Sequence, residues 1–165
     1  GTIDIISSGH KARSLEKKIQ EIDKAPFGMI SLETTLAEVI THLIAPGILT
    51  WTQAIEKLSC NPARLLGLPT GTLRVGAPAD LILIDPEERW TVDPELLVSR
   101  GTNTPLAGNQ LQGRVRQCMV DGQVVLFEPE PAVNSWRSNA RILFSVRILL
   151  PFAEFHALRA AFFFF

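Results

Sequence analysis

The sequence is poor in the residues that hold disulfide-rich and metal-binding modules together. It has no tyrosine, two cysteines and three histidines among 165 residues. Cys60 and Cys118 stand alone without CxxC spacing, so neither a zinc knuckle nor a disulfide framework is indicated. His10, His42 and His156 share no metal-ligand spacing either. We therefore expect no metal bound by this chain itself, and surface or structural roles for His42 and His156.

The sequence also lacks a dominant charge and a long hydrophobic run. Sixteen Lys and Arg residues against seventeen Asp and Glu residues give a net charge of -1, so electrostatics favour no nucleic-acid partner. No apolar run reaches the roughly 18 residues that indicate a transmembrane helix. The opening residues, GTID, do not have the basic-then-apolar pattern of a secretory leader. We expect a cytoplasmic protein with no membrane partner.

The stretch with the clearest local pattern is residues 59–86, SCNPARLLGLPTGTLRVGAPADLILIDP. Asn61 followed by Pro62 predicts a helix N-cap with proline in the first helical position. Gly67 can take the left-handed conformation that ends such a helix. Residues 72–75 then predict a short strand. The stretch is therefore expected to form a helix, a strand, a bend and a second strand, in that order.

The last part of that stretch is an unbroken apolar run at residues 81–84, closed by Asp85-Pro86. Such a run predicts a strand that is buried on both faces. Further on, Asp93-Pro94 predicts the capped start of a short helix. Two more strands, 114–120 and 123–127, are joined by Asp121-Gly122, which is a strong hairpin signal.

The first half of the chain predicts mainly helices. Residues 1–9 are rich in isoleucine and predict a strand, and Ser14 could begin a helix that extends to Ile22. Ser31 begins a stronger amphipathic pattern that continues to Ile44 and stops before Pro46-Gly47. Thr50 and Gln53 have the spacing of a capping box at the start of a third helix.

These patterns, in this order, resemble the end of an amidohydrolase-superfamily enzyme. The Asn61-Pro62-Ala63 helix start and the strand sequence GAPADLILID are similar to the region where such a chain leaves a (β/α)8 barrel for a small β-sandwich. The sequence APFGMISLETTL at residues 25–36, together with NTPL and VDGQVV further on, resembles bacterial-type dihydroorotases. The resemblance covers residues 1 to about 128.

The resemblance implies an α/β fold, a fragment of a (β/α)8 barrel comprising its last strand and following helices, plus C-terminal β-sandwich strands. Residues 1–70 would be barrel, residues 71–128 sandwich, and residues 129–165 an unrelated tail outside the selected fold. A (β/α)8 barrel needs about 250 residues, so we expect this chain to be a C-terminal fragment. Dihydroorotases interconvert carbamoyl-aspartate and dihydroorotate at a zinc site at the barrel mouth.

The resemblance also implies where a site would lie. The family has an Asp-His-Ala-Pro-His motif after the last barrel strand, where this chain reads Gly9-His10-Lys11-Ala12-Arg13. The metal-ligating and proton-shuttling Asp has become Gly9, and the substrate-holding His has become Arg13. We expect His10, Arg13, Phe27 and Gly28 to line a substrate pocket, without a catalytic residue or a metal ligand in this chain. Zinc would be the cofactor of the parent family only.

Two functions of different classes follow from these residues. The chain is either the C-terminal part of a dihydroorotase, inactive alone, or part of a non-catalytic dihydroorotase-like subunit that scaffolds aspartate carbamoyltransferase. Gly9 and Arg13 favour the scaffold, whereas the retained Ala25-Pro-Phe-Gly28 loop favours the enzyme. A homo-oligomer is the other partner to be expected in the full-length parent.

Overall fold

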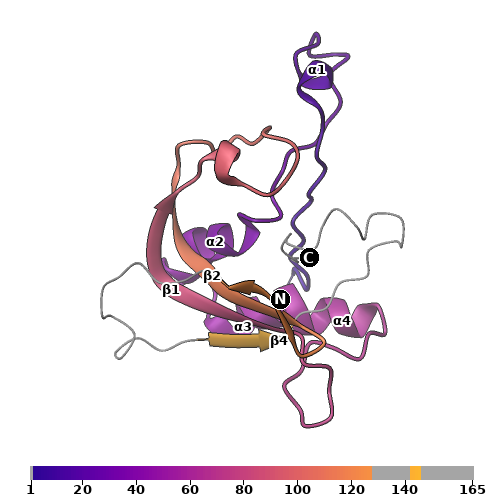
Figure 1. The fold of residues 1–165 in the computed structure, drawn as a ribbon, viewed down its shortest axis with the longest axis vertical. Helices are drawn as coiled ribbons and strands as arrows, with labels where there is room; N and C mark the ends of the chain where they lie inside the picture. The colour runs from indigo at the N-terminus through magenta and orange to yellow at the C-terminus, as the bar shows by residue number, and fades with distance from the viewer. Residues whose placement is uncertain (1, 128–141, 146–165) are drawn as a thin grey trace.

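The computed structural model describes residues 2–127 and the backbone of residues 142–145. Its centre is a four-stranded antiparallel sheet in the order β3-β2-β1-β4, which packs against helices (Figure 1). The strands are β1 (Leu81–Thr91), β2 (Gln110–Val120), β3 (Gln123–Phe127) and β4 (Ile142–Ser145). The helices are α1 (Leu15–Lys18), α2 (Thr35–Val39), α3 (Trp51–Ile55), α4 (Asn61–Leu65), the π-helices η1 (Ile40–Ile44) and η2 (Glu56–Cys60), and the 3-10 turn η3 (Pro94–Leu96).

The first long helix consists of α2 and η1 in direct succession. The carbonyl of Ser31 accepts the N–H of Thr35 at 2.9 Å, so a turn precedes the helix and the predicted start at Ser31 lies one turn early. The apolar residues of the amphipathic pattern that begins at Ser31 include Leu36, Val39 and Ile40, and all three are buried. The helix ends before Pro46, as predicted.

The second long helix runs without a break through α3, η2 and α4. The capping box is confirmed, because the Thr50 hydroxyl accepts the N–H of Gln53 and the Gln53 side chain accepts the N–H of Thr50. The prediction that Asn61 is an N-cap is wrong. Asn61 has helical dihedral angles, φ -70° and ψ -44°, because the preceding helix continues into it. Gly67 ends the helix at φ 64°, as predicted.

The sheet confirms the predicted hairpin and corrects the predicted first strand. Asp121 and Gly122 have φ values of 50° and 77°, the left-handed pair that a tight hairpin turn requires. β1 is buried on one face only, since Ile82 and Ile84 are buried while their neighbours are half-exposed. The strand also continues past Asp85-Pro86 to Thr91, because an irregularity between Asp85 and Arg89 accommodates the proline.

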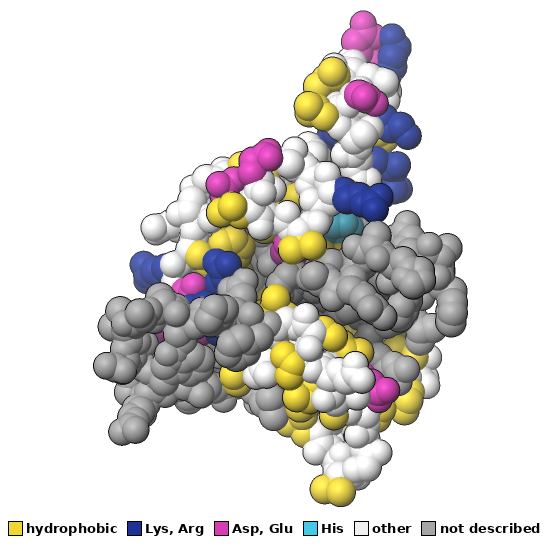
Figure 2. Space-filling view, in the orientation of Figure 1, with side chains coloured by type: hydrophobic (Ala, Val, Ile, Leu, Met, Phe, Trp, Pro, Cys, Tyr) yellow, Lys and Arg dark blue, Asp and Glu magenta, His cyan; other side chains and the backbone are white. Residues whose placement is uncertain are grey.

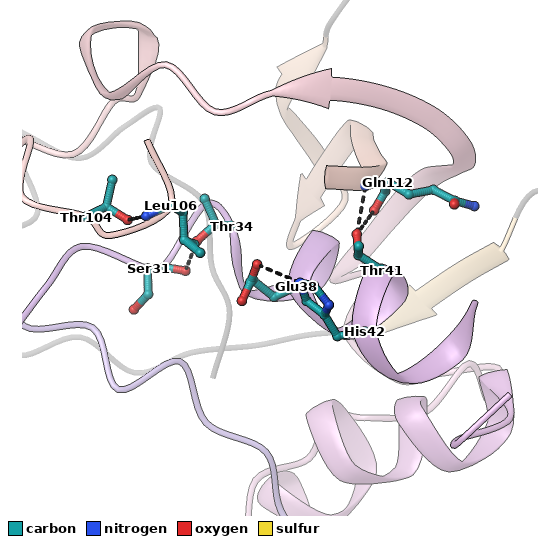
Figure 3. Close-up of polar contacts among 8 residues, drawn as sticks. All are labelled: Ser31, Thr34, Glu38, Thr41, His42, Thr104, Leu106 and Gln112. Atoms are coloured by element: carbon teal, nitrogen blue, oxygen red, sulfur yellow. Dashed lines mark hydrogen bonds and ion pairs between the residues drawn. The ribbon is translucent and has the colours of Figure 1, made fainter. Parts of the chain in front are cut away.

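One buried cluster joins the helices to the sheet. It contains Leu36, Val39, Ile40, Ala54 and Leu58 from the helices and Ile82, Ile84, Val115 and Cys118 from the sheet. The Thr41 hydroxyl fixes the contact by accepting the N–H of Gln112 in β2 at 2.8 Å (Figure 3). Residues from both predicted domains, 1–70 and 71–128, therefore share this core.

Three predicted elements in the described residues are wrong or shorter than expected. Residues 2–9 form no strand, and neither do residues 72–75. The reason is that a strand needs a paired neighbour, and neither segment has one in the part of the chain described here. The helix predicted from Ser14 to Ile22 is only the four-residue α1, at the tip of an arm that projects from the body (Figure 1).

The structure confirms an α/β chain, while the barrel fragment and the β-sandwich remain predictions. No helix in residues 2–127 is long and apolar enough to cross a membrane. Most of the predicted tail, 129–165, lies outside the described residues. The described part, β4, pairs with β1 between Leu81 and Ile84.

The contact between Gly113 and Ile40 gives a prediction about stability. Gly113 has φ 91°, and a Cβ there would lie 2.3 Å from Cδ1 of Ile40. We expect Gly113→Ala to lower the free energy of unfolding by about 1–3 kcal/mol, because the buried isoleucine must move. Urea unfolding measures the loss.

Gly76→Ala is the matched control, since Gly76 has φ 89° but open space around its Cβ position. Gly76→Ala isolates the backbone strain of a left-handed alanine. Ile40→Val removes the clashing methyl group and should recover part of the loss in the Gly113→Ala background. Equal losses at both glycines, with no recovery, would contradict the packing explanation.

Candidate functional site

The predicted site residues lie where segment 8–13 meets segment 26–33. The backbone N–H of Lys11 donates to the carbonyl of Met29 at 2.9 Å, and the Ser31 hydroxyl donates to the carbonyl of Ser8 at 2.7 Å. The Arg13 Nε donates to the carbonyl of Phe27 at 3.2 Å. The structure thus brings His10, Arg13, Phe27 and Gly28 together, and their role in substrate binding remains a prediction.

His10 is the centre of this junction. Its Nδ1 accepts the backbone N–H groups of Ser31 and Leu32, each at 3.2 Å. Burial lowers the pKa of His10 below its ordinary value of 6.5, and the negative charge of Glu33 opposes this shift. Both observations favour the neutral ring, because a proton on Nδ1 would face two N–H donors. The Nδ1 atom therefore holds the loops together, and Nε2 is the ring nitrogen left for other contacts.

Gly28 is required by the close approach of the two segments. Its φ is 134°, and a Cβ at this position would lie 2.5 Å from the carbonyl oxygen of Lys11. The Gly28 carbonyl accepts the side-chain N–H of Asn103 at 2.9 Å. The ring of Phe27, by contrast, is 94% exposed, so it lines no buried pocket in this structure. The contribution of the Phe27-Gly28 pair at this junction is made by its backbone.

Gly9 is the position where the family resemblance places a carboxylate. Its φ is 61°, and a Cβ added there would meet no atom of the described residues within 4 Å. Aspartate is one of the residues that tolerate this left-handed conformation. Position 9 therefore has room for an aspartate side chain, although the glycine itself offers no ligand atom and no proton carrier.

Sequence reasoning missed the residues that attach a third segment, 97–103. The Glu33 carboxylate accepts the N–H groups of Val98 at 2.7 Å and Ser99 at 2.9 Å, and the Ser99 hydroxyl at 2.6 Å. The N–H of Ile30 donates to the carbonyl of Asn103 at 2.9 Å. Glu33 and Asn103 lie in two of the motifs that carry the resemblance, which is the signal that could have pointed to them.

A pocket of about 90 Å³ lies beside Glu33, between the start of α2 and the strands β1 and β2. Its lining includes Leu36, Trp90, Leu97 and Arg114, and none of the predicted site residues. The Arg114 guanidinium lies 5.3 Å from the centre of the Trp90 ring, which closes one wall. This pocket therefore lies next to the junction and meets it at Glu33.

The other polar candidates are placed outside the junction. His42 is exposed on η1 and lies 3.5 Å from the Glu38 carboxylate, as Figure 3 shows, in agreement with the predicted surface role. His156 lies outside the described residues. In residues 2–127, no three His, Cys, Asp or Glu side chains come close enough to hold a metal ion.

The arm between the two junction segments, residues 14–25, exposes both hydrophobic and charged side chains. Leu15, Ile19 and Ile22 are 66%, 74% and 96% exposed. Figure 2 shows basic side chains beside these hydrophobic ones along the arm. The junction thus lies at the base of a projection, between the arm and the body of the chain.

The lowered pKa of His10 predicts a pH dependence of stability. In the unfolded chain His10 takes up its proton at about pH 6.5, whereas the folded chain takes it up at a lower pH. The contribution of neutral His10 to the free energy of unfolding is therefore complete above pH 6.5. It is lost as the pH falls from 6.5 through the lower pKa of the folded chain. We expect an NMR titration midpoint for His10 below 6.5, and an unfolding free energy that falls over that interval.

His10→Asn should keep an acceptor near the Nδ1 position without a titrating group, and so remove this part of the pH dependence. His42→Asn is the control, because His42 is exposed and distant from the junction. A His10 midpoint at or above 6.5, or an unchanged pH profile in His10→Asn, would contradict the prediction.

Comparison with known proteins agrees with the sequence motifs. Residues 21–125 match the model of the Amidohydrolase family. A dihydroorotase of Pelotomaculum thermopropionicum is 48% identical over 126 residues, which are 76% of this chain and 30% of that protein. A putative dihydroorotase of Rhodopirellula baltica is 47% identical over 135 residues, which are 82% of this chain and 29% of that protein.

Solved structures show the same relationship. An L-hydantoinase (dihydropyrimidinase) from Arthrobacter aurescens matches with a TM-score of 0.73 and 32% identity, over 81% of this chain and 31% of that one. A D-hydantoinase (dihydropyrimidinase) from a Thermus species matches with a TM-score of 0.72 and 26% identity, over 77% and 29%. This chain spans about 30% of the length of the curated relatives it matches. Because the family model covers more than half of the chain, the protein belongs to the amidohydrolase family, and the curated relatives that it resembles are dihydroorotases.

Proposed function

We propose that the chain is the C-terminal part of a dihydroorotase-family cyclic amidohydrolase, which interconverts carbamoyl-aspartate and dihydroorotate, and that the chain alone is inactive. The observation that carries the proposal is the junction of segments 8–13 and 26–33. These are two of the segments on which the resemblance to dihydroorotases rests. The ring of His10 joins them by accepting the backbone N–H groups of Ser31 and Leu32. The names of the curated relatives support the same assignment.

The residues present do not fit the zinc of the parent family. The carboxylate that the resemblance places at position 9 is replaced by a glycine with no donor atom. What remains is a binding surface: the Nε2 of His10, the terminal nitrogens of Arg13 and the backbone around Gly28. A guanidinium can hold a carboxylate through two parallel hydrogen bonds, so Arg13 would orient an anionic substrate rather than carry out chemistry.

A second candidate function is a non-catalytic scaffold subunit for aspartate carbamoyltransferase. It is favoured by one specific observation, the loss of the carboxylate at Gly9 together with the change to Arg13. In that case the loop junction would serve the fold of the subunit, and no substrate would bind. Co-elution of the full-length parent with an aspartate carbamoyltransferase on size exclusion would support it.

The first test uses the 165-residue chain with added zinc. We expect no ring opening of dihydroorotate above the uncatalysed rate, because position 9 supplies no proton carrier. Ultraviolet absorbance of the ring and metal analysis of the purified protein measure the outcome. Turnover above background with one bound zinc per chain would contradict the proposed inactivity.

The second test asks whether this segment can serve as the end of a dihydroorotase. In a chimera, residues 1–128 replace the matched segment of the Pelotomaculum dihydroorotase. We expect the unmodified chimera to be inactive and Gly9→Asp to restore activity at least tenfold above background, because a side chain at position 9 enters open space. If Arg13 blocks the substrate, Arg13→His must be added.

Arg13→His alone is the matched control and should remain inactive. Zinc content and circular dichroism identify chimeras that fail to fold. A folded, zinc-loaded chimera that stays inactive with both changes would overturn the proposed enzymatic origin and leave the scaffold as the better explanation.

A further inference from the structure

We propose that Asn61 and Pro62, together with Lys57, are positioning residues for the His10 loop. They hold segment 3–6 against the second long helix. The Lys57 carbonyl of that helix is available to this segment because Pro62 has no N–H group to bond to it. The consequence for catalysis rests on the proposed function, whereas the attachment itself can be tested on this chain alone.

The free carbonyl follows from the hydrogen-bond pattern of η2. A π-helix is characterised by bonds from an N–H to the carbonyl five residues earlier. At the end of η2 the N–H of Asn61 bonds to the carbonyl of Glu56 in this way. The next donor in the series would be residue 62, bonded to the carbonyl of Lys57. Pro62 has no N–H. The Lys57 carbonyl instead accepts the N–H of Ile6 at 3.0 Å.

Two further bonds attach the same segment to the same turn of helix. The Asn61 side-chain N–H donates to the carbonyl of Asp4 at 2.8 Å, and the Lys57 ammonium donates to the carbonyl of Ile3. The Arg64 guanidinium donates to the side-chain oxygen of Asn61 at 3.1 Å, which orients the amide so that its N–H group faces Asp4. Three of the four residues in segment 3–6, those at positions 3, 4 and 6, are therefore held by one helical turn.

The attachment lies immediately before the candidate site. Ile6 is bound to the helix, while Ser8 and His10 are bound to Ser31 in the second segment. Gly9 lies between these two attachments, within a short piece of chain. The direction in which a side chain at position 9 would point is therefore determined from both sides, by the helix and by segment 26–33.

The other π-helix provides an internal comparison. In η1 the N–H of Ala45 bonds to the carbonyl of Ile40 at 2.8 Å, and the next residue is again a proline, Pro46. Pro46 thus has the same place relative to its π-helix as Pro62. It is far in sequence from segment 3–6, and the contact of η1 with the sheet is made by the Thr41 hydroxyl. Pro46→Ala is therefore the matched control for Pro62→Ala.

The first experiment measures amide hydrogen exchange in the 165-residue chain by NMR. Pro62→Ala supplies an N–H that competes for the Lys57 carbonyl, and Asn61→Asp removes the donor to Asp4 while keeping the proline. We expect exchange at Ile6 to become at least about tenfold faster in Pro62→Ala, and the amide resonances of Ser8 to His10 to shift in both variants. Exchange at buried Val115 should not change.

Pro46→Ala should leave Ile6 and the His10 loop as they are. Unchanged exchange at Ile6 in Pro62→Ala would overturn the inference, and so would unshifted Ser8 to His10 resonances in both variants. If Val115 also exchanges faster in Pro62→Ala, Asn61→Asp decides the question, because it leaves the buried proline in place.

The second experiment adds Pro62→Ala to the chimera that carries Gly9→Asp and Arg13→His. A loosened loop should lower kcat about tenfold and change KM less than twofold, whereas Pro46→Ala should change neither. A normal kcat in the Pro62→Ala chimera would overturn the positioning role. An inactive parent chimera would overturn the proposed function only, and the exchange experiment would still decide the attachment.

Discussion

The packing of two π-interrupted helices onto one face of the β1–β2 pair is the contact on which the remaining structure depends. It brings Ile40 so close to the backbone of Gly113 that no side chain fits at position 113. The bond between Thr41 and Gln112 fixes the helix along the strand beside this contact. This packing fixes where the helices begin and where the strands end. It therefore also fixes the positions of the loops that extend from them.

The loop junction is held together mainly by hydrogen bonds between side chains and backbone groups. His10 accepts two backbone N–H groups, Glu33 accepts two more, and Asn103 donates to the carbonyl of Gly28. Each of these bonds joins segments that are far apart in the sequence, so the junction depends on the packed helices and strands behind it. Burial keeps the His10 ring neutral, which suits a ring whose Nδ1 must act as an acceptor.

The sequence of the junction differs from what the family resemblance implies at Gly9, where an aspartate is expected, and at Arg13, where a histidine is expected. Gly9 has a left-handed conformation that an aspartate also tolerates, but it carries no carboxylate. Hydrogen bonds join segments 8–13, 26–33 and 97–103, and in residues 2–127 no three His, Cys, Asp or Glu side chains come close enough to hold a metal ion.

The sequence by itself determined the features that depend on a few adjacent residues: the capping box at Thr50 and Gln53, the turn at Asp121-Gly122, and the Asp93 cap, whose carboxylate accepts the N–H of Glu95. Tertiary structure decided the rest. Residues 2–9 and 72–75 have strand-like composition but no paired neighbour in the described chain, and Asn61 lies inside a helix because the preceding turn continues into it. The bonds of His10 and Glu33 could not be predicted either, because their partners lie 21 to 66 residues away and only the fold brings them within reach.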